Sequence, residues 1–116
     1  MGWQQVTNFV EKDWGSELWM VNNKLYCGKI LTLKKNYCCS RHYHKLKDET
    51  FYILEGKVLM ETNRTIKTMN KGDVIHIPQK TIHRFTGIED SKIIEISTEH
   101  FDSDSYRLIK GGKVKK

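Results

Sequence analysis

The sequence predicts an all-β domain, and three observations support this fold class. Short runs rich in Val, Ile, Phe, Tyr and Thr recur along the chain, and Gly, Asn and Asp separate them at the regular spacing of a sandwich or barrel. No stretch has the apolar periodicity of an amphipathic helix, except for a single turn near Asp102 to Leu108. Pro78, the only proline, ends a run, because proline cannot donate a hydrogen bond to a strand ladder.

About eight strands are expected from Tyr26 onward. Their ranges are 26–33, 37–43, 50–54, 57–61, 65–69, 74–77, 83–86 and 92–97. The run Thr50 to Leu54 is apolar on both faces, which indicates a strand that is covered on both sides. Gly56 then forms a tight turn into the next strand, because glycine adopts a positive φ without steric cost.

The length of 116 residues fits one domain with a hydrophobic core of its own. We expect three parts: an N-terminal arm over residues 1–24, the domain itself over 25–108, and a basic flexible tail over 109–116. Trp3, Trp14 and Trp19 lie in the arm, and we expect their indoles to cover the outside of the sheet.

The cysteines and the hydropathy indicate a cytoplasmic protein. Cys27, Cys38 and Cys39 are odd in number and two are adjacent, so they do not form a disulfide framework, and a reducing compartment is expected. We interpret them as small buried apolar side chains. No signal-peptide core and no run of about 18 apolar residues occurs, which argues against a membrane span.

The net charge of +6 is concentrated near the C-terminus. The remaining excess of basic residues suits a small anionic substrate, since charge complementarity raises the local concentration of such a ligand. No nucleic-acid-binding motif occurs in the sequence, so a nucleic-acid partner is not expected.

Two histidines and a glutamate predict a metal site. His42 and His44 are one residue apart, so on a strand both side chains face the same side. A turn over residues 45–48 would return the chain and place Glu49 beside them on the next strand. Two imidazoles and a carboxylate on a rigid sheet suit a divalent cation of the first transition row or zinc.

Two stretches of the sequence resemble the paired motifs of the cupins. In the first motif His42, His44, Glu49 and Gly56 match, and in the second Gly72, Pro78 and His83 match. Asn36 and Lys80 replace glycines of the pattern, and Gly87 replaces an asparagine. The resemblance implies a single-domain jelly-roll β-barrel that holds one divalent metal ion (Zn, Mn, Co, Fe or Ni) on His42, His44, Glu49 and His83.

The flanking sequence is similar to the cupin domain of type II mannose-6-phosphate isomerases over about residues 13–108. The similarity rests on Trp14-Gly15-Ser16, on GDVIHIPQKTIHR, and on IIEIS followed by DSDSYRL. It implies a metal-dependent isomerase or epimerase that acts on a sugar or sugar phosphate by proton transfer through an enediol. The chain departs from that pattern in one extra residue before Glu49 and in Ser97, which stands where the family tends to have glutamine.

The resemblance to the isomerases implies that Glu95 is the general base. Glu95 stands between Ile94 and Ile96, and burial on this strand would raise its pKa toward the working pH. If the side chain faced outward instead, it would be a solvated surface charge.

Arg107 and Lys45 complete the set that the resemblance implies. Arg107 would bind a phosphate with its guanidinium fork, or else form a surface ion pair with Asp102 or Asp104. Lys45 stands where the isomerases have arginine, next to the ligands, and would assist. His76 and His100 are expected to be ordinary histidines rather than ligands.

Two other functions remain open at this point. Three histidines and a glutamate also serve iron-dependent or nickel-dependent cupin dioxygenases, and a non-catalytic sugar-binding cupin would share the fold. A homodimer is expected in each case, because Tyr52 and Leu54 face away from Phe51 and Ile53 and require cover on a second side.

Overall fold

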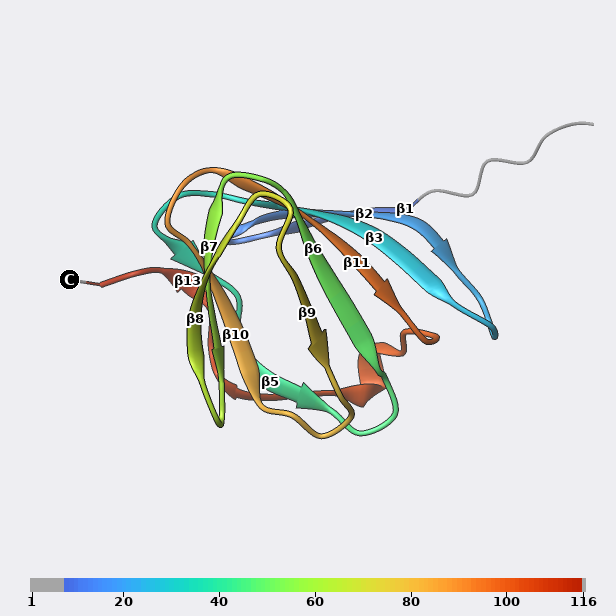
Figure 1. The fold of residues 1–116 in the computed structure, drawn as a ribbon. Helices are drawn as coiled ribbons and strands as arrows, with labels where there is room; N and C mark the ends of the chain where they lie inside the picture. Colours follow the sequence, from blue (N-terminus) through green and yellow to red (C-terminus); the bar gives the residue numbers. More distant parts are fainter. Residues whose placement is uncertain (1–7, 116) are drawn as a thin grey trace, which may run out of the picture.

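The structure is a computed structural model that describes residues 8–115 of the chain, and two sheets account for its architecture (Figure 1). The first sheet has six strands in the order β1-β2-β3-β11-β6-β9. Its strands are β1 (Asn8–Lys12), β2 (Gly15–Asn22), β3 (Cys27–Leu33), β11 (Ser91–Ser97), β6 (Glu49–Glu55) and β9 (Val74–Ile77). All pairings within this sheet are antiparallel.

The second sheet has seven strands, with β5 and β10 near its centre. Its strands are β12 (Ser105–Ile109), β5 (Arg41–His44), β10 (His83–Gly87), β4 (Tyr37–Cys38), β13 (Gly112–Lys113), β7 (Lys57–Thr62) and β8 (Ile66–Asn70). The β7–β8 hairpin joins through β7 to β10. The chain crosses repeatedly between the two sheets, so the expected all-β jelly-roll of a single domain is confirmed.

The expected strand over residues 37–43 is the one that the structure divides. β4 ends at Cys38 and β5 begins at Arg41, and the two pair with different parts of β10. The amide of Cys39 still donates to the carbonyl of Phe85, at 3.2 Å, so the interruption is a local irregularity beside β10. The other predicted strands agree with the structure to within one or two residues at each end.

Residues 8–22 of the expected N-terminal arm form two strands of the first sheet. β1 and β2 form a hairpin that extends the sheet beyond β3, with Leu18 paired to Ile30. Strand pairing satisfies the backbone groups of this segment, whereas a chain laid across the sheet would leave many of them to solvent. Trp3 lies outside the described residues.

Trp14 belongs to the core instead of covering the outside. It is 7% exposed and meets Phe85 edge-on, with ring centroids 5.4 Å apart. The next residue, Gly15, has a φ of +149° and packs so closely on the carbonyl of Thr32 that a Cβ would overlap that oxygen. Glycine therefore allows the β1–β2 hairpin to close over the interior.

The last described residues, 109–115, run beside the second sheet. β12 continues to Ile109, and β13 pairs with β4. The amide of Val114 donates to the carbonyl of Asn36 at 2.7 Å. The turn expected near residues 102–108 is a 3-10 turn, η1 (Asp102–Asp104), and it leads directly into β12. Over residues 8–115 no helix has the length and hydropathy to cross a membrane.

The core lies between the two sheets, and it is largely aliphatic. It consists of Trp14, Leu31, Leu33, Cys39, Phe51, Ile53, Val58, Met60, Met69, Ile77, Phe85 and Ile93. All three cysteines are buried as free thiols, as predicted. Burial raises the pKa of the Cys39 thiol to about 12, so this group stays protonated at neutral pH.

The two departures from the glycine pattern occur where the backbone is left-handed. Asn36 and Lys80 both have a φ of 67°, and they are the only non-glycine residues with positive φ between residues 8 and 115. Asparagine tolerates this region because its short side chain bonds locally, while lysine has no such compensation. The turns of the motif are thus kept without their glycines.

Candidate metal centre

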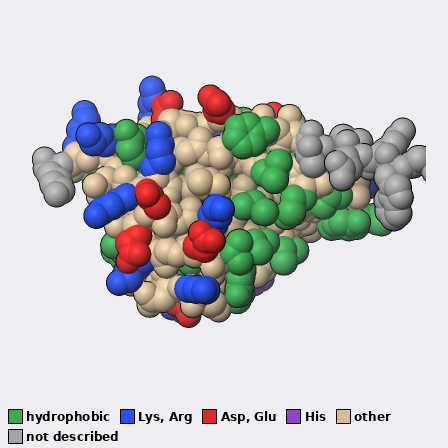
Figure 2. Space-filling view, turned by 90° about the horizontal axis from the view of Figure 1, so that it is seen from above, with side chains coloured by type: hydrophobic (Ala, Val, Ile, Leu, Met, Phe, Trp, Pro, Cys, Tyr) green, Lys and Arg blue, Asp and Glu red, His purple; other side chains and the backbone are tan. Residues whose placement is uncertain are grey.

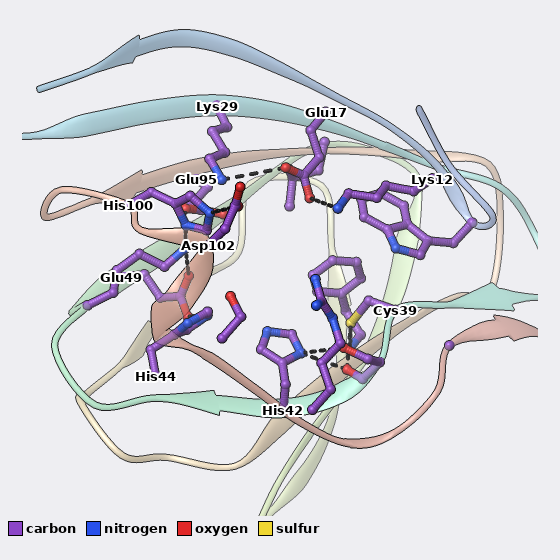
Figure 3. A pocket seen from close by; sticks show the side chains of 18 of the residues that line it. Lys12, Glu17, Lys29, Cys39, His42, His44, Glu49, Glu95, His100 and Asp102 are labelled. Atoms are coloured by element: carbon purple, nitrogen blue, oxygen red, sulfur yellow. Dashed lines mark hydrogen bonds and ion pairs between the residues drawn. The ribbon is translucent and has the colours of Figure 1, made fainter. Parts of the chain in front are cut away.

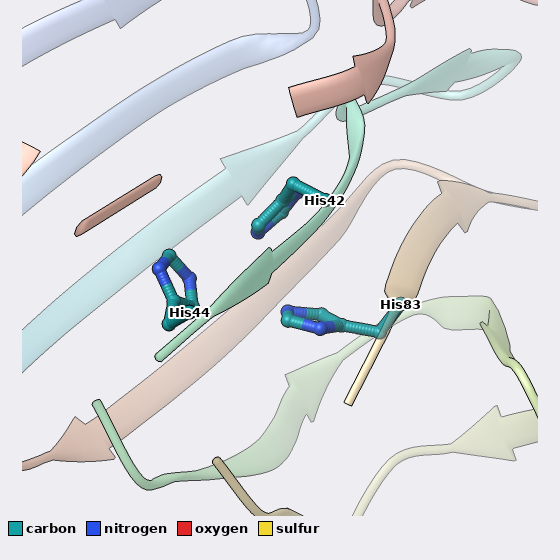
Figure 4. A group of neighbouring side chains, drawn as sticks. All are labelled: His42, His44 and His83. Atoms are coloured by element: carbon teal, nitrogen blue, oxygen red, sulfur yellow. The ribbon is translucent and has the colours of Figure 1, made fainter. Parts of the chain in front are cut away.

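Three histidines from two neighbouring strands of the second sheet gather around one space on the inner side of that sheet (Figure 4). His42 and His44 lie on β5 and project to the same side, and His83 begins β10 directly opposite His42. Each imidazole offers one nitrogen, and these three nitrogens all lie within 4.8 Å of one another. This spacing is small enough for one metal ion to bind all three.

Each histidine is fixed in the tautomer that a metal ion requires. The Nδ1 atom of every ring lies at hydrogen-bond distance from a backbone carbonyl: His42 to Ser40 (2.7 Å), His44 to Asp104 (3.1 Å) and His83 to Thr81 (2.9 Å). A carbonyl can only accept, so each Nδ1 carries the hydrogen and each neutral ring keeps its lone pair on Nε2. Metal-binding histidines are commonly oriented in this way.

Glu49 reaches the same space from the opposite sheet. It begins β6, and its Oε2 atom lies 3.1 Å from Nε2 of His83 and 3.5 Å from Nε2 of His44. Both Oε2 of Glu49 and Nε2 of His83 are fully buried and have no hydrogen-bond partner. Two buried acceptors that face each other require a proton or a cation between them, so the residues present fit a bound metal ion.

The electrostatics of His42, His44 and Glu49 favour the forms that bind cations. Burial, together with the neighbouring His83, lowers the pKa of His42 to about 3. Burial also lowers the pKa of His44 to about 4, and the charge of Lys47 acts in the same direction. For Glu49 burial opposes ionisation, but the adjacent His83 and the charge of Lys47 hold its pKa below the ordinary value. Neutral rings at His42 and His44 and an ionised carboxylate at Glu49 are therefore expected at pH 7.

Lys47 is a buried ammonium group behind Glu49 that the sequence analysis took for a turn residue. Its side chain is 3% exposed, and Nζ lies 3.4 Å from Oε1 of Glu49 and 3.0 Å from Oε2 of Glu95. Nζ also lies 3.1 Å from Nδ1 of His100. Burial disfavours the ammonium form, yet Glu95 and Glu49 raise the pKa of Lys47 above its ordinary value, so it stays charged.

His100 continues this network toward solvent. Its Nε2 atom lies 2.9 Å from the exposed carboxylate of Asp102, and its ring meets Trp19 edge-on. Burial and the charge of Lys47 lower the pKa of His100 to about 4. His76, in contrast, is exposed on β9 and bonds Asp48 at 2.7 Å. The expectation that neither histidine belongs to the ligand cluster agrees with these positions.

The three residues expected to act in catalysis occupy different positions. Glu95 is 4% exposed and faces the interior beside Lys47, so it is not a solvated surface charge. Arg107 lies on β12 opposite His42 and lines the cavity, where it is exposed. No ion pair joins it to Asp102 or Asp104 in the described part of the chain, since those carboxylates bond other groups.

Lys45 follows the last residue of β5, and its Nζ atom lies 4.6 Å above the ring of Tyr106. Tyr106 in turn stacks on Tyr43, with ring centroids 5.0 Å apart. Lys45 is therefore part of an external aromatic cluster.

A cavity of about 500 Å³ opens onto the histidines (Figure 3). Across it from the candidate metal ligands lie Lys29 and Glu17, from β3 and β2. Lys29 is 2% exposed, and its Nζ atom lies 3.5 Å from Glu17 and 4.1 Å above the ring of Trp19. The cavity thus has one end lined by the candidate metal ligands and a second end lined by a charged pair.

The residues that the sequence analysis missed are Lys47, Asp104 and the Lys29–Glu17 pair. One feature of the sequence could have identified Lys47. It is two residues before Glu49, so the two side chains can face the same side in an extended chain. Asp104 reaches the site through tertiary folding across 57 or more residues, which no local pattern reports.

Comparisons with known proteins agree with this arrangement. A family model described as the cupin domain matches residues 30–97, a range that contains all four candidate ligands. Quercetin 2,3-dioxygenase of Bacillus subtilis (strain 168) is 43% identical over 44 residues, which are 38% of this chain and 13% of that protein. The chain therefore spans only a small part of this curated relative.

Solved structures share the fold at low sequence identity. KdgF from Halomonas sp. superposes with a TM-score of 0.71 and 18% identity, over 76% of this chain and 82% of that one. A variant of oxalate decarboxylase from Bacillus subtilis gives a TM-score of 0.79 and 16% identity, over 88% of this chain and 30% of that one. At these identities the likeness concerns the fold alone.

Proposed function

The chain belongs to the cupin family, and from this premise we propose that it is a metal-dependent enzyme that acts on a small oxygen-bearing molecule. The observation that carries the proposal is the facing pair of buried, unpartnered atoms, Oε2 of Glu49 and Nε2 of His83. His42, His44, Glu49 and His83 would hold one divalent ion, and three nitrogens with one oxygen suit Zn, Mn, Co, Fe or Ni. The ion would supply Lewis acidity and positions open to substrate.

In finer detail, we propose a sugar or sugar-phosphate isomerase or epimerase related to mannose-6-phosphate isomerase. The polar far end of the cavity supports a hydroxylated substrate, because Lys29 can donate hydrogen bonds and Glu17 can accept them. Arg107, exposed beside His42, is placed to bind an anionic group such as a phosphate.

Glu95 is the residue proposed to move the proton between carbons. Its Oε2 atom is held by Lys47 at 3.0 Å and accepts from Ser97 at 3.3 Å, which leaves Oε1 to receive a proton. The ammonium group of Lys47 orients the Glu95 carboxylate through this buried contact. The same ammonium group can stabilise negative charge that develops on a substrate oxygen.

A dioxygenase is the second candidate, and the local match to quercetin 2,3-dioxygenase favours it. The ligand set is equally suited to Fe or Ni. A non-catalytic sugar-binding protein is the third candidate, and it would show ligand-induced stabilisation without turnover.

The first test is metal content by mass spectrometry on protein purified without an affinity tag. We expect close to one transition metal per chain, and loss of that metal in His42→Ala. His76→Ala is the matched control, because His76 is exposed and remote from the cluster, so this variant should retain the metal. A wild-type protein that contains no metal and takes up none on dialysis would overturn the proposed function.

The second test separates the candidate activities. Ketose formation from aldose 6-phosphates without oxygen uptake would support the isomerase, and Glu95→Gln should then abolish turnover while metal content stays near one. Oxygen consumption with quercetin as the probe would support the dioxygenase. Stabilisation by sugars without either reaction would support the binding protein.

We further propose that the protein acts in the cytoplasm as a homodimer. Three buried free thiols suit a reducing compartment. On the outer face of the first sheet, Ile94 lies between Ile30 on β3 and Tyr52 on β6, and Ile96 on the same strand is 58% exposed. Apolar side chains gather over part of the face seen from above (Figure 2). A second copy would bury this surface.

A further inference from the structure

Asp104 joins the C-terminal segment to the loop between two candidate metal ligands. Its side chain is 4% exposed, and the carboxylate accepts the backbone amides of Lys45 (2.9 Å), Leu46 (3.1 Å) and Lys47 (3.0 Å). Three successive amides that converge on one anion form a concave nest, an arrangement that stabilises negative charge strongly. The loop conformation therefore depends on one carboxylate from a distant part of the sequence.

The same residue also contacts a ligand directly. The backbone carbonyl of Asp104 accepts the hydrogen of Nδ1 of His44 at 3.1 Å. The following residue, Ser105, pairs with His44 in the register of β12 and β5. One residue thus fixes the ring orientation of His44 through its backbone and the loop that follows His44 through its side chain.

The loop determines where Glu49 and Lys47 lie. Four residues separate His44 from Glu49, and Glu49 begins β6 on the opposite sheet. Without an acceptor, the amides of residues 45–47 would be left partly buried and unsatisfied, and the loop would adopt another path. Lys47, whose amide Asp104 holds, directs its ammonium group at the carboxylate of Glu49.

We propose that Asp104 is a positioning residue that sets the geometry of His44 and Glu49 for metal binding before the ion arrives. This inference rests on the proposed metal site. Ligand-orienting groups of this kind contribute 10- to 100-fold to metal affinity in other metalloproteins.

The test is metal affinity of the full chain carrying Asp104→Asn, measured with Co²⁺ and Zn²⁺ in competition with a chromophoric chelator. We expect the affinity to fall about 10- to 100-fold, because one amide oxygen and an NH₂ group cannot accept three amides. The visible absorption of bound Co²⁺ should change as well, since it reports the coordination geometry. Asp104→Asn that binds Co²⁺ with wild-type affinity and spectrum would overturn the inference.

A matched control separates positioning from general stability. Ser91→Ala removes another buried polar side chain, whose Oγ atom accepts the amide of Lys57 at 3.0 Å and otherwise bonds the carbonyls of Lys57 and Glu89 rather than a candidate ligand. This variant should lower the melting temperature of the metal-free protein but leave the metal affinity unchanged. If both variants lose affinity in proportion to stability, Asp104 has a structural role only and the inference fails.

Two further outcomes are distinguishable. A wild-type protein that binds neither ion overturns the proposed metal site itself, and not only the role of Asp104. If Asp104→Asn does not fold, Asp104→Glu serves in its place, because it keeps the charge and both oxygens but displaces them by one methylene group. We expect this variant to fold with reduced Co²⁺ affinity and an altered Co²⁺ spectrum, and wild-type values would contradict the inference.

Discussion

Nζ of Lys47 lies 3.4 Å from Oε1 of Glu49, while Oε2 of the same carboxylate lies 3.1 Å from Nε2 of His83. The two oxygens of Glu49 are therefore divided between an ammonium group and the histidine cluster. Lys47 also binds Glu95, so a single cation holds two buried carboxylates that would otherwise repel each other. This arrangement leaves one oxygen of Glu49 for a metal ion and favours ligation through that oxygen alone.

Replacing this cation should be costly to stability. Lys47→Met keeps the length of the side chain but leaves Glu49 and Glu95 buried without a counter-charge. We expect the free energy of unfolding of the metal-free protein to fall by about 3 kcal/mol or more, the usual loss when one partner of a buried ion pair is removed. Urea denaturation at pH 7 measures the change.

The control for this substitution is Lys57→Met. Lys57 forms an ion pair with Glu89 at 3.9 Å, but both side chains are largely exposed. Its loss should change the free energy of unfolding by no more than about 1 kcal/mol. Equal effects of the two substitutions would show that the buried contacts of Lys47 do not stabilise the protein more than a surface pair does.

Most of the fold could be predicted from local sequence patterns. The strand at Thr50 to Leu54 and its turn at Gly56 follow from apolar residues and glycine, and both occur in the structure. The N-terminal hairpin was missed because its polar and apolar residues do not alternate clearly, and tertiary pairing with β3 decides its conformation. Propensity alone does not report such pairing.

The candidate site was predictable where spacing constrains geometry. His42 and His44 face one side because strands have a period of two, and the motif supplied Glu49 and His83. The role expected for Lys45 stays a prediction, and its ammonium group lies over the ring of Tyr106. Asp104 was not predictable, since only the folded chain brings it to the loop after His44.

The metal-free protein should lose stability as the pH falls from about 6.5 toward 4. Burial lowers the pKa of His42 to about 3 and the pKa of both His44 and His100 to about 4. Histidines in the unfolded chain titrate near 6.5, so below that pH the unfolded state takes up protons that the folded state does not. The free energy of unfolding thus has its full value, as far as these histidines are concerned, above about pH 6.5. It declines as the pH approaches the pKa values of the folded state.

Thermal melts in the presence of a chelator across this pH range test whether stability falls on acidification. His100→Gln should reduce the slope of melting temperature against pH, because it removes one buried imidazole. His76→Gln is the control and should leave the slope unchanged, since His76 is exposed. A melting temperature that rises on acidification over this range would contradict the expectation.

Restoring the motif glycine at residue 80 should stabilise the protein. Lys80 has a φ of 67°, a conformation that costs a side chain with a Cβ roughly 1–2 kcal/mol. Glycine removes that cost but adds about 0.5–1 kcal/mol of backbone entropy to the unfolded state. Lys80→Gly should therefore raise the free energy of unfolding by about 0.5–1 kcal/mol in urea denaturation.

Lys71→Gly is the control for the glycine substitution, because Lys71 lies in an exposed turn without a positive φ. It should destabilise the protein slightly, through unfolded-state entropy alone. If Lys80→Gly is as destabilising as Lys71→Gly, the left-handed backbone at residue 80 is not a source of strain.

The proposed dimer predicts a specific effect of charge on the outer face of the first sheet. Ile96 is 58% exposed there, while Ile66 is 69% exposed on β8 of the second sheet. Light scattering should give a dimer for the wild type at micromolar concentration. Ile96→Lys should shift the protein toward monomer, because a two-fold interface would bring two like charges together and desolvate them. Ile66→Lys should remain a dimer, and a wild type that is monomeric at micromolar concentration would exclude the proposed interface.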